Sequence, residues 1–425
     1  MTTNSVNETY PLMHAENTTE IARSKDRFIK TFKQSFLALA FDLGGLLAGS
    51  ILVAFSDVLS FAPWILIIYP SILSMRGVIG GFFSGRLSTA LHLGTVRPSF
   101  LNNTRNFRIL VYSTVILTLQ SSLMMGALAY FINVSLRGTQ MIDSLSIFSV
   151  ILTTMGLSLF FVSPVTIGIS ILSFKHGLDP DIIVYPVMST LGDILVTLCF
   201  VLSLKILFSG FLSSLSAWLF DAAFILFVVF LLAKHRKIEG LSRTIREFSL
   251  TLVVVTLIVN LTGNLLGRIG ELVGKRAEIY VLYPALIDTI GDVGSIVGST
   301  TTTKLALGTV TSSYRSIRKS LPEISGTLIS STLWFLFFSF IALLLAHGVF
   351  APNDLLVLSA ILLSLNALAG PIMAAVSYGV AVLTFRHGLD PDNFVIPCES
   401  SLSDSVTTAC LLAVLFLFMQ ANLFL

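Results

Sequence analysis

The sequence predicts an all-α integral membrane protein with about 11 transmembrane helices, arranged as two parallel five-helix repeats joined by a connecting helix. Three observations predict this fold: an apolar composition, a series of long apolar stretches, and an internal duplication. Hydrophobic residues make up 54% of the chain and charged residues 12%, with a mean hydropathy of +0.89. Because soluble domains carry about 25% charged residues, we expect nearly the whole chain to lie in a lipid bilayer. The net charge of +3 does not indicate a nucleic-acid partner.

Eleven apolar stretches are long enough to span a bilayer, which takes about 20 residues in a helix. They are expected at about residues 34–56, 62–95, 107–133, 145–174, 182–208, 213–233, 246–267, 279–309, 325–347, 354–384 and 393–419. The stretches at 62–95 and 279–309 are also rich in Gly, Ser and Thr, so we expect a broken or kinked helix in each. Membranes tolerate such breaks only where neighbouring helices or a water-filled cavity satisfy the backbone.

Two pairs of segments show that the chain is internally duplicated. Residues 174–197 and 385–408 align without a gap and are identical at 13 of 24 positions, including His-Gly-Leu-Asp-Pro-Asp and a later Asp inside an apolar run. Residues 69–96 and 283–310 are identical at 10 of 28 positions. A weaker match extends the repeat to the first helix of each half, where it pairs Asp42 with Asn260, Gly45 with Gly263, and Gly49 with Gly267.

The duplication divides the chain into four parts: a cytoplasmic N-terminal tail (1–33), a first membrane repeat (34–210), a connecting helix with a basic loop (211–245), and a second membrane repeat (246–425). Five helices leave the chain on the far side of the membrane, and the connecting helix returns it to the side where it began. The two halves are therefore expected to be parallel. The tail is polar and has no apolar core of a signal peptide, so we expect it to be short and disordered.

The distribution of basic residues predicts the orientation in the cell membrane. With the N-terminus in the cytoplasm, 18 of the 26 Lys and Arg residues lie on cytoplasmic segments and only five on outer segments. An excess of Lys and Arg marks cytoplasmic loops. We therefore expect the C-terminus outside and both Gly-Leu-Asp-Pro-Asp turns on the cytoplasmic side.

Acids inside apolar stretches are the candidate functional residues, because an ionisable residue at membrane depth costs about 2.5–3.5 kcal/mol on insertion scales and usually faces a bundle interior or a pore. These acids are Asp42, Asp193, Asp288, Asp292 and Asp404. Asp193 and Asp404 occupy equivalent positions in the duplicated segment. In parallel halves, two equivalent helices can meet at the axis with their acids opposed, and opposed carboxylates favour a cation between them. The alternative is that each acid is a structural buried charge with its own partner.

Asp179 and Asp390 precede Asp193 and Asp404 by 14 residues, which is about 20 Å in a helix that rises about 1.5 Å per residue. Each comes before a Pro, as an N-cap often does, and could also attract cations at the cytoplasmic mouth. His176 and His387 precede the same turns. They could be ligands or pH sensors, but a His that caps a helix C-terminus is the favoured interpretation.

Asp288 and Asp292 lie four residues apart, on one face of one helix. Their counterparts in the first half are Ser74 and Val78, so this pair of acids is not duplicated. Arg76 and Arg86 lie within the equivalent helix of the first half and could neutralise either acid, which would make the pair purely structural. The three cysteines have no Cys-x-x-Cys spacing and no clustered His, so neither a disulfide nor a zinc site is expected.

The duplicated Gly-Leu-Asp-Pro-Asp motif, followed by a Pro, a Ser and an intramembrane Asp, resembles the last helix of the MgtE magnesium transporter family. The run RGVIGGFFSGRLSTALHLG resembles the second-helix segment of the archaeal and eukaryotic solute-carrier relatives of that family. In those relatives one chain with two five-helix domains mimics the MgtE homodimer. The resemblance extends over residues 34–420, so a monomer is expected.

The resemblance implies a Mg²⁺ pathway on the pseudo-twofold axis, with Asp193 and Asp404 matching the pore aspartate of the family and Asp179 and Asp390 matching the Asp of its turn. The chain departs from the family pattern at Val78, which replaces the usual Asn, whereas Asp292 fills that place in the second half. The 425 residues contain neither the N domain nor the CBS domains of MgtE, so closure on cytosolic Mg²⁺ through those domains is not expected.

We therefore expect a Mg²⁺ channel or transporter that holds the hydrated ion between paired carboxylates, with no organic cofactor and no catalytic residue. Mg²⁺ gives up its water reluctantly, and discrimination against Co²⁺, Mn²⁺ or Ni²⁺ would be weak. A Na⁺- or H⁺-coupled Mg²⁺ exchanger is the main alternative, with Asp42, Asp288 and Asp292 as further sites. An intramembrane hydrolase is less favoured because no His-Glu-x-x-His motif occurs, and the buried acids disfavour a non-transporting scaffold.

Overall fold

A computed structural model describes residues 9–59, 61–62, 64–100, 102–137, 141–176, 180–235, 238–274, 276–388 and 392–421. Over these residues the chain is helical and forms no strand. The first half contains α1 (Thr9–Ala38), the 3₁₀ helix η1 (Leu39–Asp42), α2 (Leu43–Ala54), α3 (Ser56–Leu59), α4 (Ile65–His92), α5 (Arg105–Arg137), α6 (Met141–Lys175) and α7 (Pro180–Phe208). After α8 (Phe211–His235) come α9 (Glu239–Val273), α10 (Ala277–Ala306), the 3₁₀ helix η2 (Tyr314–Ser320), α11 (Leu321–His347), α12 (Pro352–Arg386) and α13 (Asp392–Gln420).

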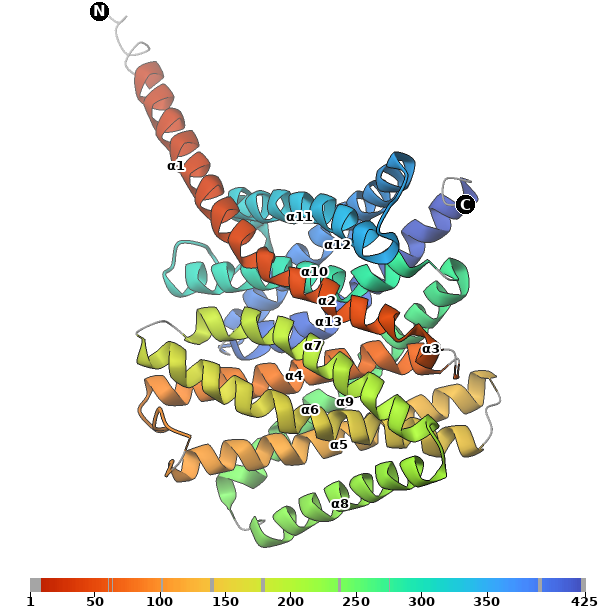
Figure 1. The fold of residues 1–425 in the computed structure, drawn as a ribbon. Helices are drawn as coiled ribbons and strands as arrows, with labels where there is room; N and C mark the ends of the chain where they lie inside the picture. Colours follow the sequence, from red (N-terminus) through yellow and green to blue (C-terminus); the bar gives the residue numbers. More distant parts are fainter. Residues whose placement is uncertain are drawn as a thin grey trace, which may run out of the picture.

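Eleven helical stretches in the described part of the chain are long and apolar enough to cross a membrane. They coincide with the eleven stretches expected from the sequence, with α1 and α2 together forming the first. The predicted all-α integral membrane fold is thereby confirmed. The helices run side by side in one bundle, and α8 lies at one edge of it (Figure 1). Large apolar side chains of α8, such as Leu226, Phe227 and Phe230, are exposed, as expected for a surface that faces lipid.

The first helix of each half packs against the second helix of the other half. α2 packs against α10, and α9 packs against α4. Glycines permit both crossings: a Cβ atom on Gly49 would lie 2.2 Å from the backbone oxygen of Val281, and one on Gly263 would lie 1.9 Å from that of Ile67. Small residues let membrane helices approach this closely. Each half therefore contributes a helix to the core of the other, and the halves are interlocked.

These crossings also define the register of the repeat. Ile67 and Val281 are equivalent at an offset of 214 residues. Gly49 therefore corresponds to Gly263, one helical turn away from the pairing with Gly267 that the sequence alignment suggested. The weak alignment was wrong here because several glycines recur at four-residue spacing in these helices. Asp42 corresponds to Thr256 in the corrected register.

Matching hydrogen bonds recur in the two halves. The Tyr69 hydroxyl lies 2.9 Å from Thr197 Oγ1, and the Tyr283 hydroxyl lies 2.9 Å from Thr408 Oγ1. All four residues are buried. Each bond joins the second helix of a half to its last helix, α4 to α7 and α10 to α13. The sequence duplication is thus also a structural one.

The connecting helix α8 is attached to the first half by a buried acid. Asp221 accepts hydrogen bonds from Ser149 Oγ at 2.5 Å and from Thr153 Oγ1 at 2.8 Å, both on α6. These bonds satisfy a carboxylate that would otherwise be costly to bury. Since both oxygens have hydroxyl partners, the role of Asp221 is structural.

Two expectations about irregular backbone differ from the structure. α4 and α10 are not broken: each runs as one helix through the stretch where a broken or kinked helix was expected, and each contains a proline, Pro70 or Pro284. The break lies instead in the first span, where η1 separates α1 from α2. The expected disordered tail is also helical from Thr9 onward, and its later part packs on α11 through stacked rings of Phe28, Phe32, Phe36 and Trp334.

Candidate functional site

Five acidic side chains line a cavity inside the bundle. It encloses about 830 Å³ of empty space, part of it open to the outside, and lies between α4, α6, α7, α10 and α13. Four acids predicted from the sequence line it: Asp193, Asp288, Asp292 and Asp404. Each comes from the central part of a helix, so the cavity reaches the middle of the bundle.

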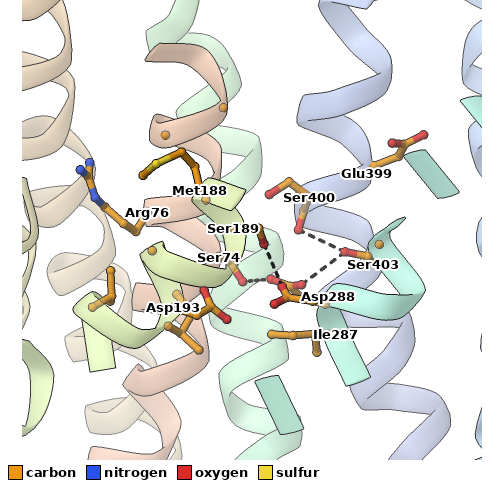
Figure 2. A pocket seen from close by; sticks show the side chains of 18 of the residues that line it. Ser74, Arg76, Met188, Ser189, Asp193, Ile287, Asp288, Glu399, Ser400 and Ser403 are labelled. Atoms are coloured by element: carbon orange, nitrogen blue, oxygen red, sulfur yellow. Dashed lines mark hydrogen bonds between the residues drawn. The ribbon is translucent and has the colours of Figure 1, made fainter. Parts of the chain in front are cut away.

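Asp193 of α7 and Asp404 of α13, the duplicated pair, face the same space and are close enough to interact electrostatically. Asp288 of α10 is also close enough to interact electrostatically with Asp193 and with Asp404. In Figure 2 the side chains of Asp193 and Asp288 lie at a similar height, and Ser74 is drawn between them. The structure therefore brings together three carboxylates where the duplicated segment alone would supply two.

The pseudo-symmetric partners of the two central aspartates differ. The Ser74 hydroxyl donates a hydrogen bond to Asp404 Oδ2, and Ser403 donates to Asp404 Oδ1 at 3.3 Å. At the place equivalent to Ser74, the second half has Asp288, which cannot donate a hydrogen bond to Asp193 when both are ionised. Consistent with this, Asp193 Oδ2 and Asp288 Oδ2 are buried and have no hydrogen-bond partner. Ser189 donates to the other oxygen of Asp288 at 3.3 Å.

Asp42 lies next to this group but does not line the cavity. It ends η1, is only 4% exposed, and accepts a hydrogen bond from Thr289 of α10 at 2.7 Å. Its carboxylate is within electrostatic range of Asp292 and Asp193. The backbone break in the first span thus places a fifth acid beside α10. The five candidate acids of the apolar stretches lie in one region.

Glu399 of α13 is a lining residue that the sequence analysis did not identify. Its side chain is buried, with 3% of the residue exposed, and neither carboxylate oxygen has a hydrogen-bond partner. The repeat alignment does contain a signal, because the equivalent residue of the first half is Met188, which also lines the cavity. Glu399 was overlooked because it lies in a polar stretch near the start of its helix, where an acid looks solvent-exposed.

The arginines of α4 do not neutralise the acids. Arg76 also lines the cavity, but its Nη2 donates to the carbonyl oxygen of Ser158 at 3.5 Å and to Ser163 Oγ at 3.4 Å. Arg86 donates to Thr244 at 3.1 Å. Neither forms an ion pair with an acid among the residues that the structure describes.

The two histidines that precede the duplicated turns are described, and neither lines the cavity. His176 Nδ1 and His387 Nδ1 each lie 2.8 Å from a carbonyl oxygen one helical turn earlier, so both rings cap a helix C-terminus as favoured from the sequence. Asp179 and Asp390 lie outside the described residues. In the described ranges, no three His, Cys, Asp or Glu side chains come close enough together to hold a metal ion directly.

The chain is similar in sequence to one known protein family. The sequence model of the MgtE family, described as a divalent cation transporter, matches residues 69–203 and 283–414. One matched range falls in each half, and the two ranges contain all the acids that line the cavity. No curated protein and no solved structure matches the chain. Because the matched ranges cover more than half of its length, the chain belongs to the MgtE family of divalent cation transporters.

Proposed function

We propose that the protein moves Mg²⁺ across the cell membrane through the cavity, with the hydrated ion held by Asp193, Asp404 and Asp288. Mg²⁺ keeps several waters when it binds to proteins and is held through one or two carboxylates. A cavity with opposed acids and room for water suits that mode of binding. Direct coordination by several protein ligands is not required.

The observation that carries this proposal is the facing pair Asp193 and Asp288. Each has a buried oxygen without a hydrogen-bond partner, and the two carboxylates repel each other. A buried charge without a partner is costly. A divalent cation between Asp193 and Asp288 would offset their repulsion and would give each unpartnered oxygen a positive partner. Asp404 lies within range to add a third negative charge.

We also propose that the cavity opens toward the cytoplasm. The cavity extends from the central aspartates toward the N-terminal ends of α7 and α13, where Met188 and Glu399 line it. The excess of Lys and Arg on loops at that end favours the cytoplasmic side. We place the N-terminus in the cytoplasm and the C-terminus outside. One chain carries both halves, so a monomer suffices for a complete pathway.

The test is uptake of Mg²⁺ by proteoliposomes that contain the purified protein. The double variant Asp193→Asn with Asp404→Asn should lose most of the flux, because it removes two of the three central charges and preserves side-chain size. Asp221→Asn is a matched control, since it removes a buried charge that already has two hydroxyl partners. Flux at the wild-type level in the double variant would contradict the proposal.

A coupled exchanger is the second candidate, favoured by two acids that have no acidic counterpart in the other half. Asp292 and Asp42 lie beside the central group, where a Na⁺ ion or a proton could bind while Mg²⁺ moves. Measuring Mg²⁺ flux while the Na⁺ gradient and the pH gradient are varied separately distinguishes the two. A channel would respond to neither gradient at constant membrane potential.

A further inference from the structure

We propose that Asp292 and Glu399 form a second station for a divalent cation, one helical turn from the central aspartates and built by the second half alone. The inference rests on the proposed transport of divalent cations through the cavity. It assigns to the pathway a site that is not on the pseudo-twofold axis. The occupant is a divalent cation that keeps much of its water.

The two carboxylates meet from two helices. Asp292 lies on α10 and Glu399 on α13, both line the cavity, and they are within electrostatic range of each other. Glu399 is buried, yet its Oε1 and Oε2 lack hydrogen-bond partners. Ser295 and Ser377 lie beside it, but their hydroxyls do not satisfy either oxygen by hydrogen-bond geometry. Glu399 is thus a buried acid that lines the cavity and has no hydrogen-bond partner, and a cation nearby would stabilise its ionised form.

Local packing holds this carboxylate in place. A Cβ atom on Gly294 of α10 would lie 2.8 Å from Ser377 Oγ of α12 and 3.6 Å from Glu399 Cγ. The glycine therefore leaves the space that the Glu399 side chain and its neighbour occupy. α10, α12 and α13 pack against one another in pairs, so the acid sits at the junction of three helices rather than on a mobile surface.

The station is displaced in one direction along the pathway. Glu399 precedes Asp404 by five residues, about 7.5 Å toward the start of α13, and Asp292 follows Asp288 by four residues, about 6 Å toward the end of α10. The two helices run in opposite directions, so both displacements lead to the same end of the bundle. In Figure 2, Glu399 lies apart from the group that contains Asp193 and Asp288. A cation can therefore pass from one group to the other over a short distance.

The first half has no equivalent station. The residues that correspond to Asp292 and Glu399 are Val78 and Met188, and both are apolar. Met188 lines the same cavity. The ion path is thus expected to run off the axis, along α10 and α13, before it reaches the central aspartates. Two divalent ions about 7 Å apart repel strongly even in water, so an ion entering one station favours release from the other.

Mn²⁺ binding measured by electron paramagnetic resonance on the purified full-length protein in nanodiscs tests the inference. At a free Mn²⁺ concentration near the wild-type Kd of the second station, Glu399→Gln should bind clearly less Mn²⁺ than the wild type, and Asp292→Asn should show the same loss. The double variant should lose at most one ion in total, because both residues belong to one site. Asp221→Asn, which neutralises a satisfied buried acid, should leave the number unchanged. All variants should elute as the wild type does in size-exclusion chromatography.

Mg²⁺ transport, measured with the ion added on one side of the membrane at a time, provides a second test. Removing one unit charge about 6 Å from a divalent ion in a water-like dielectric weakens binding about tenfold. Glu399→Gln should therefore raise the half-saturating Mg²⁺ concentration about tenfold from the side at which α13 begins, and not from the other side. Asp221→Asn, which neutralises a buried acid away from the cavity, should leave both values unchanged.

The inference is overturned if Glu399→Gln binds as many Mn²⁺ ions as the wild type, or if the double variant loses two ions where each single variant loses one. Its failure is separable from that of the transport proposal. Unchanged Mn²⁺ binding in Glu399→Gln would contradict only the second station. Full Mg²⁺ flux in the Asp193→Asn and Asp404→Asn double variant would contradict the central site, whatever Glu399→Gln shows in Mn²⁺ binding.

Discussion

Replacing Asp288 with Ser would make the centre of the cavity symmetric, because Ser74 occupies the equivalent position in the first half. Ser74 donates a hydrogen bond to Asp404, and a serine at 288 can donate to Asp193 in the same way. The substitution removes one of two facing carboxylates, each of which has a buried oxygen without a partner. It is expected to stabilise the cation-free protein and to weaken cation binding.

The size of each effect follows from the charges involved. Two carboxylates about 5 Å apart at an effective dielectric constant of about 20 repel each other by about 3 kcal/mol. A new hydrogen bond to the remaining charged group adds about 1.5–3 kcal/mol. Even if the cation-free state relieves half of the repulsion, Asp288→Ser should raise the free energy of unfolding by about 2 kcal/mol or more. The substitution also removes one negative charge from the cation site. A divalent ion about 6 Å from that charge, in a water-like dielectric, loses about 1.4 kcal/mol of attraction, which lowers its affinity about tenfold.

Thermal unfolding of the detergent-solubilised protein, with and without Mg²⁺, measures both effects on one sample. Without divalent cations, the Asp288→Ser protein should melt a few degrees above the wild type. Adding Mg²⁺ should raise its melting temperature by less than it raises that of the wild type, since stabilisation by a ligand follows its affinity. The two effects have opposite signs, which distinguishes them from general damage to the fold.

Ser74→Ala is the matched control. It removes the hydrogen bond to Asp404 without changing the charge, so it should lower the melting temperature in the absence of cations. A lower melting temperature for cation-free Asp288→Ser, or a Mg²⁺-induced shift equal to that of the wild type, would refute the assignment of Asp193 and Asp288 as a facing pair that needs a cation.

Three further predictions concern the fold. Gly263→Ala should lower the melting temperature sharply, because a Cβ atom there would lie 1.9 Å from a backbone oxygen of α4, whereas Gly85→Ala, with no atom within 4 Å, should not. Asp221→Ala should cost about 1–3 kcal/mol by leaving two hydroxyls of α6 without their acceptor, yet Mg²⁺ flux per folded molecule should stay at the wild-type level; a loss of flux would assign α8 a direct role. Tyr69→Phe and Tyr283→Phe should each cost about 0.5–1.5 kcal/mol in chemical unfolding, and clearly unequal losses would argue against equivalent packing of the two halves.

Much of the fold could be read from the sequence because a bilayer restricts what a chain can do. A spanning segment must be helical to satisfy its own backbone, so eleven apolar stretches predict eleven helices without any knowledge of their neighbours. The duplicated segment likewise identified Asp193 and Asp404, since a shared position in two repeats implies a shared place in two parallel halves. The structure places both at one cavity.

What the sequence could not decide depends on which helices face each other. The alignment of the first helices missed the true register by one turn, because only the crossings of Gly49 and Gly263 with the opposite half define it. Glu399 looked like a solvent-exposed acid until packing against α10 and α12 buried it. The break at Asp42 is also tertiary, since the acid is held there by Thr289 of the other half.

The sequence by itself therefore determined the helices, their number, the duplication, and the pair Asp193 and Asp404, because hydropathy and identity along the chain are local properties. Only the tertiary structure decided that Asp288 faces Asp193 where Ser74 hydrogen-bonds to Asp404, and that Glu399 joins the cavity. The physical reason is that a buried charge is satisfied or unsatisfied only with respect to side chains on other helices. Two halves that share one ancestry in sequence thus form a cavity whose charge lies mainly on the second half.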